Sequence, residues 1–411
     1  MIQGERLWHR LMELGEIGKQ DSGGVTRLSF TPEDRNAKAL TASYMKEAGL
    51  EVREDAVGNL IGRKEGSNPQ LAPIIIGSHI DTVYDGGRFD GALGVLSGIE
   101  VLQSIGDNGI ILQRSVEVVA FTDEEGARFG FGMIGSRAMA GTLKASDLAH
   151  CDQEGVSIQE AMLQDGLNPA ELKKAASSAI HAYLELHIEQ GKVLESQGKQ
   201  VGIVTGISGP LWMKVTLEGE AGHAGATPMR LRRDPLAVAA ALMVEIEQIA
   251  SSYPGTVATV GKLQVYPGGI NIIPSKVEFS IDLRDIDAVI RDQAEVRIRK
   301  AIQTTCEARE ISWDVEDYQR VPPTPCSEDL QAVITEACIP SGVDPVYLPS
   351  GAGHDAMQFR EVCPIGMIFV RSREGISHSP SEWSTQEDCE KGTELLYHTL
   401  LLLDGRTESF N

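Results

Sequence analysis

Residues 73–81 read PIIIGSHID, a short apolar run that ends in histidine and aspartate, and residues 116–125 read VEVVAFTDEE, an apolar run that ends in three carboxylates. Residues 182–190, AYLELHIEQ, have the same form, and strand character returns at residues 364–370. Short apolar runs separated by helical patterns are typical of buried parallel strands. They predict an α/β domain with a mostly parallel sheet flanked by helices. Ligands bind beyond the carboxyl ends of such strands, where the first three runs place His, Asp or Glu.

The pattern changes after about residue 207. Residues 211–217 and 277–283 alternate between apolar and polar side chains, which indicates half-buried antiparallel strands. Between them, Asp234 and Pro235 suit the N-cap and first turn of a helix, and residues 287–309 show a second helical pattern. We therefore predict a catalytic domain of residues 1–207 and 325–411, interrupted by an inserted α+β domain of residues 208–324 with an antiparallel sheet and two helices.

Composition limits the classes of partner. The 411 residues include 37 basic and 59 acidic side chains, for a net charge of −22, which argues against nucleic acid or an anionic membrane as partner. The sequence shows neither a signal-peptide pattern nor an apolar run of about 18 residues that could span a membrane. The six cysteines are scattered without a C-x-x-C pair. We therefore expect reduced thiols, a cytoplasmic location and metal ligands drawn from histidine and carboxylate.

Polar segments beside the predicted strands carry candidate metal ligands. His79 could bind a metal through one ring nitrogen while Asp81, two residues on, holds the ring. Asp90 lies in the segment GGRFDG, whose glycines allow close backbone approach, and its carboxylate could bridge two cations. Glu124 and Glu125 belong to an acidic run whose burial would raise the pKa values unless cations offset the charge. We predict Glu125 as a ligand and Glu124 as the general base.

Two further histidines complete the candidate set. His187 lies in ELHIEQG and His378 lies in GISHSP. Taken singly, each segment has an ordinary explanation: a hydrogen-bonded structural histidine, a plain turn or an exposed acidic turn. Taken together, three histidines and two or three carboxylates can hold two metal ions that share Asp90. Such a mixture of ligands suits Zn, Mn, Co or Ni.

These segments, with GHAGATPM, NIIP and GAGHDA, resemble the dinuclear metallohydrolase superfamily of aminoacylases, carboxypeptidase-G-like enzymes and di- and tripeptidases. The resemblance covers nearly the whole chain and is greatest to the N-carbamoyl-L-amino acid amidohydrolases, whose relatives include allantoate amidohydrolase and β-ureidopropionase. It implies two divalent ions per subunit, a bridging aspartate and a catalytic glutamate. By position, the implied ligands are His79, Asp90, Glu125, His187 and His378, and the implied base is Glu124.

The resemblance also implies that the inserted domain is a lid and a dimerisation domain. His223 and Asn271 match substrate-binding positions, and His223 would reach the oxyanion of the reaction, commonly from the partner subunit. Arg284 matches a third such position, and its guanidinium could hold a carboxylate in a bidentate pair. The alternative for Arg284 is an ordinary ion pair with Asp282 or Asp285. Three further candidates for the wall of the pocket are Gln190, Gly351 and Ala352.

The expected activity is hydrolysis of the ureido C–N bond of an N-carbamoyl-L-amino acid to the L-amino acid, ammonia and carbon dioxide. The substrate is a small molecule that carries a carboxylate, and the expected assembly is a homodimer. Allantoate and 3-ureidopropionate are alternative substrates in the same reaction class. A dipeptidase or N-acyl amidase is another alternative, and a non-catalytic dimeric binding protein is a third. The sequence leaves open the native metal and the preferred side chain, and only the resemblance indicates the L enantiomer.

Overall fold

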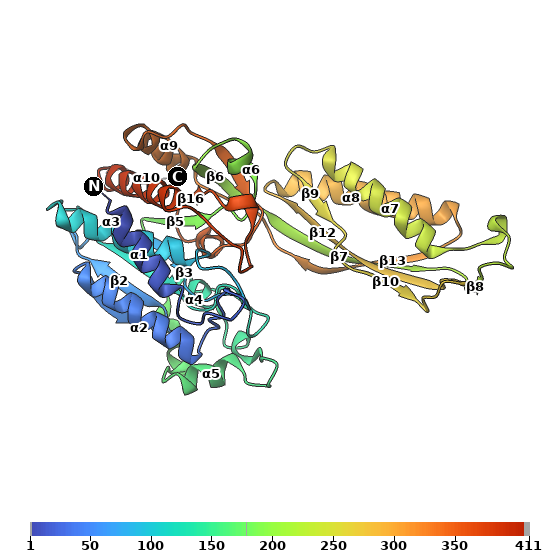
Figure 1. The fold of residues 1–411 in the computed structure, drawn as a ribbon, viewed down its shortest axis with the longest axis horizontal. Helices are drawn as coiled ribbons and strands as arrows, with labels where there is room; N and C mark the ends of the chain where they lie inside the picture. The colour runs from blue at the N-terminus through green and yellow to red at the C-terminus, as the bar shows by residue number, and fades with distance from the viewer. Residues whose placement is uncertain (1, 178, 407–411) are drawn as a thin grey trace. The chain divides into compact units, whose positions relative to one another are not determined.

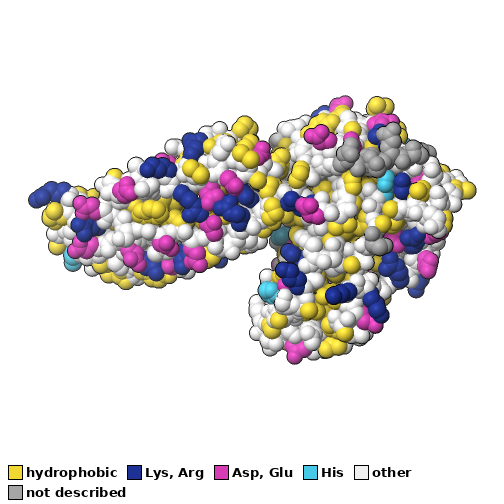
Figure 2. All heavy atoms as spheres, turned by 180° about the vertical axis from the view of Figure 1, so that it is seen from behind, with side chains coloured by type: hydrophobic (Ala, Val, Ile, Leu, Met, Phe, Trp, Pro, Cys, Tyr) yellow, Lys and Arg dark blue, Asp and Glu magenta, His cyan; other side chains and the backbone are white. Residues whose placement is uncertain are grey.

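The structure is a computed structural model that describes residues 2–177 and 179–406. These residues form two compact units: unit 1 contains the chain up to Thr205 and from Cys326 onward, and unit 2 runs from Gly206 to Pro325 (Figure 1). Within the described ranges, no helix has the length and apolar character needed to cross a membrane. On the face shown in Figure 2, acidic and basic side chains are interspersed over both units, so the acidic excess does not gather there in one patch.

The sheet of unit 1 is parallel at its centre and antiparallel at its edges. Its central strands lie in the order β4 (Val116–Phe121), β3 (Ile74–His79), β5 (Ala182–Ile188) and β16 (Ile365–Val370), and neighbours in this series run parallel. This confirms the mostly parallel α/β sheet predicted from the four apolar runs. The sequence did not predict the flanking strands, which are β1 (Glu51–Glu54), β2 (Leu60–Lys64), β6 (Val201–Ile207), β14 (Thr324–Pro325) and β15 (Tyr347–Ser350).

Alternation along β5 separates a structural face from a polar face. Leu184 and Leu186 belong to the main hydrophobic core, whereas Tyr183 and His187 point to the other side of the sheet. There the ring of Tyr183 stacks on Phe359 with centroids 4.5 Å apart. The main core is completed by five helices: α1 (Gly4–Leu14), α2 (Pro32–Glu47), α3 (Ala92–Asp107), α9 (Glu328–Ser341) and α10 (Gln386–Asp404). Shorter helices are α4 (Ile134–Met139), α5 (Ile158–Gln164) and α6 (Val193–Ser196).

Unit 2 is an antiparallel sheet with two helices, as the alternating pattern predicted. The long strands β7 (Gly209–Glu218) and β12 (Lys276–Asp285) pair along their whole length, and their apolar side chains pack against α7 (Pro235–Ser251) and α8 (Ala288–Ala308). The Asp234 side chain caps α7 by accepting hydrogen bonds from the backbone N–H groups of the first turn. The other strands are β8 (Gly222–His223), β9 (Val257–Thr259), β10 (Leu263–Tyr266), β11 (Ile272–Ile273) and β13 (Ser312–Arg320).

Candidate metal centre

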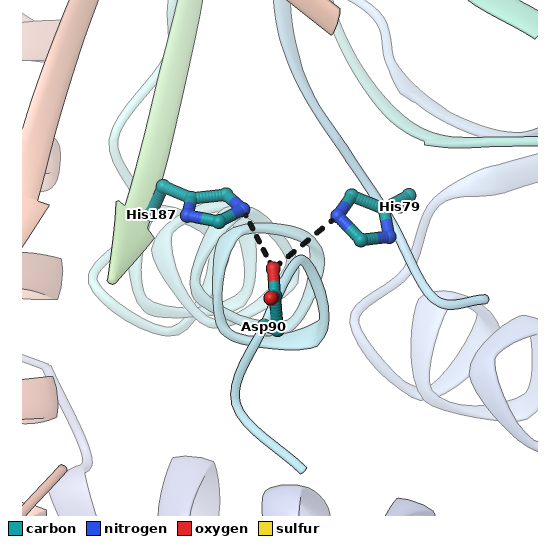
Figure 3. A group of neighbouring side chains, drawn as sticks. All are labelled: His79, Asp90 and His187. Atoms are coloured by element: carbon teal, nitrogen blue, oxygen red, sulfur yellow. Dashed lines mark ion pairs between the residues drawn. The ribbon is translucent and has the colours of Figure 1, made fainter. Parts of the chain in front are cut away.

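Asp90 lies among three histidines of unit 1. Its Oδ1 atom is 3.1 Å from Nε2 of His187 and 3.6 Å from Nε2 of His79. Its Oδ2 atom is 3.2 Å from Nε2 of His378. Figure 3 shows the rings of His79 and His187 pointing toward the Asp90 carboxylate from opposite sides. The arrangement therefore presents several nitrogen and oxygen donors around one shared carboxylate.

Glu125 extends this arrangement to a second group of donors. Its Oε1 atom lies 3.5 Å from Nε2 of His378, is buried and accepts no hydrogen bond from the residues that the structure describes. The donor atoms of Asp90, Glu125 and His378 all lie within 4.8 Å of one another, as do those of His79, Asp90 and His187. A buried carboxylate oxygen without a hydrogen-bond partner is costly unless a cation is bound, so these residues fit divalent metal ions.

The strand order explains why these residues meet. His79 is the last residue of β3, and His187 lies near the carboxyl end of the neighbouring parallel strand β5. Asp90 stands just before α3, and Gly91 between them has a φ of +63°. A Cβ atom on Gly91 would come within 2.4 Å of the His79 ring, so only glycine allows the helix to begin so close to the imidazole.

Burial and like charge raise the pKa values of two carboxyl groups of the centre, those of Glu124 and Glu125. Burial, followed by the negative charge of Asp355, raises the pKa of Glu124 well above its usual value, although the nearby His79 opposes this. Burial, followed by the charge of Asp90, raises the pKa of Glu125 to about 7. His378 forms a hydrogen bond with Asp90, and this bond is the largest of the causes that raise the pKa of His378 to about 9. Bound divalent cations would offset the negative charge of these carboxylates, so that the carboxylates would not need to take up protons.

Asp81 supports the centre in two ways. Nδ1 of His79 lies 3.0 Å from the main-chain oxygen of Asp81 and 3.6 Å from its carboxylate, so the ring is held mainly by the backbone. The Asp81 carboxylate instead accepts hydrogen bonds from the backbone N–H groups of Glu124 and Glu125, at 3.2 Å each. The sequence predicted only the contact with the ring. In the structure, Asp81 also orients the turn that carries the predicted base and one predicted ligand.

The additional candidates of unit 1 differ in their distance from the centre. Gln190 donates a hydrogen bond from Nε2 to Oδ2 of Asp90 at 2.9 Å, so it contacts the centre directly. Gly351 and Ala352 lie in the loop after β15. Two residues farther along this loop, the buried His354 packs its ring edge-on against His187, with centroids 4.5 Å apart. The loop therefore approaches the centre through His354.

The candidates of unit 2 fall in two places: His223 and Asn271 lie at a separate two-stranded sheet of β8 and β11, and Arg284 lies on β12 of the five-stranded sheet. His223 and Asn271 lie together, because the backbone N–H of Ala224 donates to the carbonyl of Asn271 and β8 pairs with β11. Arg284 lies near the far end of β12, roughly 25 Å along the strand from Lys276 at about 3.3 Å per residue. Nε and Nη2 of Arg284 donate to Asp282, at 2.9 and 2.7 Å, so the ordinary ion pair that the sequence left open is present.

Two polar side chains at the centre were not predicted. Ser377 donates to Oδ2 of Asp90 at 2.9 Å, and Glu382 accepts a hydrogen bond from the backbone N–H of Asp90 at 3.1 Å. Their nearness to His378 in the sequence was the available signal. It was weak, because a serine and a glutamate in a loop are most often exposed.

Comparison with known proteins agrees with this geometry. The sequence profile described as peptidase family M20/M25/M40 matches residues 75–402. The chain is 59% identical over 402 residues to an N-carbamoyl-L-amino acid amidohydrolase of Geobacillus stearothermophilus, and the match covers 97% of this chain and 98% of that protein. It is 38% identical over 390 residues to an allantoate amidohydrolase of Bacillus subtilis, with 93% and 95% covered.

The solved structures give the same result for the fold. An amidase of the hydantoinase/carbamoylase family from Burkholderia multivorans superposes with a TM-score of 0.94 at 36% sequence identity, and the match covers 98% of each chain. A hydantoinase/carbamoylase family amidase from Burkholderia ambifaria superposes with a TM-score of 0.93 at 37% identity, with 99% of each chain covered. The chain therefore belongs to peptidase family M20/M25/M40 and, within it, to the amidohydrolases related to the N-carbamoyl-L-amino acid amidohydrolases.

Proposed function

We propose that this protein hydrolyses the ureido C–N bond of N-carbamoyl-L-amino acids to the L-amino acid, ammonia and carbon dioxide. The observation that carries the proposal is the pair of donor groups that share Asp90, in a chain 59% identical to an N-carbamoyl-L-amino acid amidohydrolase. Glu124 lies beside this pair, with Oε2 3.8 Å from Nε2 of His79. Two donor groups and an adjacent carboxyl group are what metal-assisted hydrolysis requires.

The proposed cofactor is a pair of divalent ions, of Zn, Mn, Co or Ni. His79, Asp90 and His187 would hold one ion, and Asp90, Glu125 and His378 would hold the other. When bound, such ions polarise a carbonyl and lower the pKa of water toward neutrality. Gln190 donates to Asp90 in the structure, so its amide is placed at the edge of the same centre.

Glu124 is the proposed general base and then the general acid. Burial raises the pKa of its carboxyl group, which favours uptake of a proton. It would take the proton from the water that attacks the ureido carbonyl and deliver a proton to the leaving nitrogen. Asp81 keeps Glu124 in place through the hydrogen bond from the Glu124 backbone N–H.

We also propose that the protein acts as a homodimer in which His223 serves the metal centre of the partner subunit. The supporting observation is that His223 and Asn271 lie at one end of unit 2, whereas Arg284 lies at the end where the chain enters and leaves that unit. The exposed His223 imidazole would stabilise the oxyanion, and Arg284 would exchange its pairing with Asp282 for the substrate carboxylate.

Mixed dimers test this assembly. Glu124→Gln and His223→Ala subunits should each be nearly inactive alone. In a heterodimer of the two, one site combines an intact Glu124 with the His223 of the other chain. After co-refolding, about a quarter of the wild-type activity should return if subunits pair at random. If His223 acted within its own subunit, mixing would restore no activity.

A substrate panel tests the activity. We would measure ammonia release by the metal-reconstituted protein from N-carbamoyl-L-methionine, its D enantiomer, allantoate and 3-ureidopropionate, and free amine from N-acetyl-L-methionine and a dipeptide. The L-carbamoyl compound should give the highest kcat/KM. A preference for allantoate would agree with the proposed mechanism but contradict the proposed substrate. Allantoate is included because an allantoate amidohydrolase is 38% identical to the chain. Inactivity on every compound with both ions bound would leave the binding-protein alternative.

A further inference from the structure

Glu382 is a buried carboxylate that joins two loops of the metal centre. Its side chain is in the loop that follows His378 and is only 3% exposed. Its Oε1 atom accepts hydrogen bonds from the backbone N–H groups of Phe89 and Asp90, at 2.9 and 3.1 Å. The main chain at the shared aspartate is therefore held by a residue almost three hundred positions away in the sequence.

Ser377 connects the same two carboxylates through their side chains. Its Oγ atom lies 2.9 Å from Oδ2 of Asp90 and 2.9 Å from Oε2 of Glu382. The single hydroxyl hydrogen of Ser377 can be donated to only one of these two oxygens at a time, so the backbone N–H of Asp90 is the constant link between Glu382 and Asp90. Together these contacts limit the movement of the Asp90 carboxylate, which must face two donor groups at once.

The surroundings are shaped to hold the Glu382 carboxylate in one place. A Cβ atom on Gly87 would lie 1.9 Å from the carboxyl carbon of Glu382, so the carboxylate occupies the space that any other residue would fill. The residue that follows Glu382, Trp383, packs its ring with those of Trp8 and Phe89, with centroids 5.4 to 5.8 Å apart. A buried carboxylate whose Oε1 atom accepts two backbone hydrogen bonds has little freedom to move.

We propose that Glu382 is a positioning residue that orients the Asp90 carboxylate for metal binding. This inference rests on the metal centre of the proposed function, but among the described residues Glu382 belongs to neither group of donor atoms around Asp90. Partners outside the ligand set commonly contribute about 10- to 100-fold to metal affinity, because they fix the orientation of the ligand. The competing explanation is that Glu382 only fastens two loops together, in which case its loss would lower stability and leave metal affinity unchanged.

Two variants and one control separate these explanations. Glu382→Gln keeps the shape of the side chain but removes its charge, and Gly87→Ala displaces the carboxylate without altering it. The control is Asp404→Asn, because Asp404 is also buried and accepts hydrogen bonds from two consecutive backbone N–H groups, those of Gln113 and Arg114, at 2.8 Å each. Mn²⁺ alone would be titrated into each metal-free protein by calorimetry, and Tm would be measured with and without Mn²⁺.

We expect both test variants to bind Mn²⁺ about 10- to 100-fold more weakly than the wild type, and the control to bind it normally despite a lower Tm. Wild-type affinity in Glu382→Gln and Gly87→Ala, together with a lower Tm, would overturn the proposal. The titration contains no substrate, so its result is independent of the substrate panel. Wild-type protein that binds Mn²⁺ but hydrolyses no compound would contradict the proposed function alone, whereas wild-type protein that binds none of Zn²⁺, Mn²⁺, Co²⁺ and Ni²⁺ would contradict both.

Discussion

Replacement of Glu124 by glutamine is expected to lower kcat by about 10²- to 10⁴-fold while the metal ions stay bound, the range that general acid–base groups contribute. Glutamine has nearly the same shape but can neither accept the proton of the attacking water nor deliver one to the leaving nitrogen. Glu124 belongs to neither group of donor atoms in the structure, so its loss should leave metal binding intact. The measurement is the steady-state rate on N-carbamoyl-L-methionine with metal content determined on the same sample.

Glu117→Gln is the matched control for Glu124→Gln. Glu117 is also a buried carboxylate and lies on β4, the strand that leads into the acidic turn, but it pairs with Arg53 and Arg63. Its replacement should alter stability and leave kcat near the wild-type value. A Glu124→Gln enzyme that retained kcat within a few-fold, with both ions present, would show that another group moves the proton.

Replacement of Asp90 by asparagine is expected to abolish tight binding of at least one metal ion, and activity should fall with it. Asp90 is shared by the two groups of donor atoms, and an amide offers one neutral oxygen in place of a charged carboxylate with two. The loss of affinity should exceed the roughly 10- to 100-fold that is typical of a partner outside the ligand set. Metal analysis after dialysis, with calorimetric titration of the metal-free protein, measures the effect.

Asp85→Asn provides the comparison for Asp90→Asn. Asp85 is in the same loop but accepts a hydrogen bond from Ser22 and belongs to neither donor group. Asparagine tolerates its φ of +52°, so the backbone should not change. Two ions in Asp85→Asn and fewer in Asp90→Asn would agree with the shared-ligand arrangement. Full occupancy in Asp90→Asn, at wild-type affinity, would rule it out.

The fold could be predicted from the sequence where burial follows a local pattern. The apolar runs that became β3, β4, β5 and β16 are buried along their whole length, so apolar side chains predominate in them. The edge strand β13 could not be predicted in this way. Its side chains are almost all exposed, and the apolar alternation in its sequence, SWDVEDYQR, is confined to Trp313 and Val315. Strands of this kind are specified by pairing with a neighbour, which for β13 is β7.

The residues of the candidate site also fall into two groups, those that the sequence marks as candidates and those whose contacts only the structure shows. His79, Asp90 and Glu125 stand in segments whose glycines and predicted strand ends mark them as candidates in the sequence alone. Glu382 and Ser377 carry no such mark, because their contacts with Asp90 depend on how distant segments pack. The same is true of Arg284, since only the structure shows its pairing with Asp282.

By itself, the sequence determined the class of fold, the positions where strands run into metal-binding residue types, and the family that these motifs resemble. These properties are local, since periodicity reports burial and a motif places its own side chains. Only the tertiary structure decided that Asp90 lies between His79, His187 and His378, and that Gly91 makes room for an imidazole ring. Such contacts join residues far apart in the chain, and they exist only once the strands and helices have packed against one another.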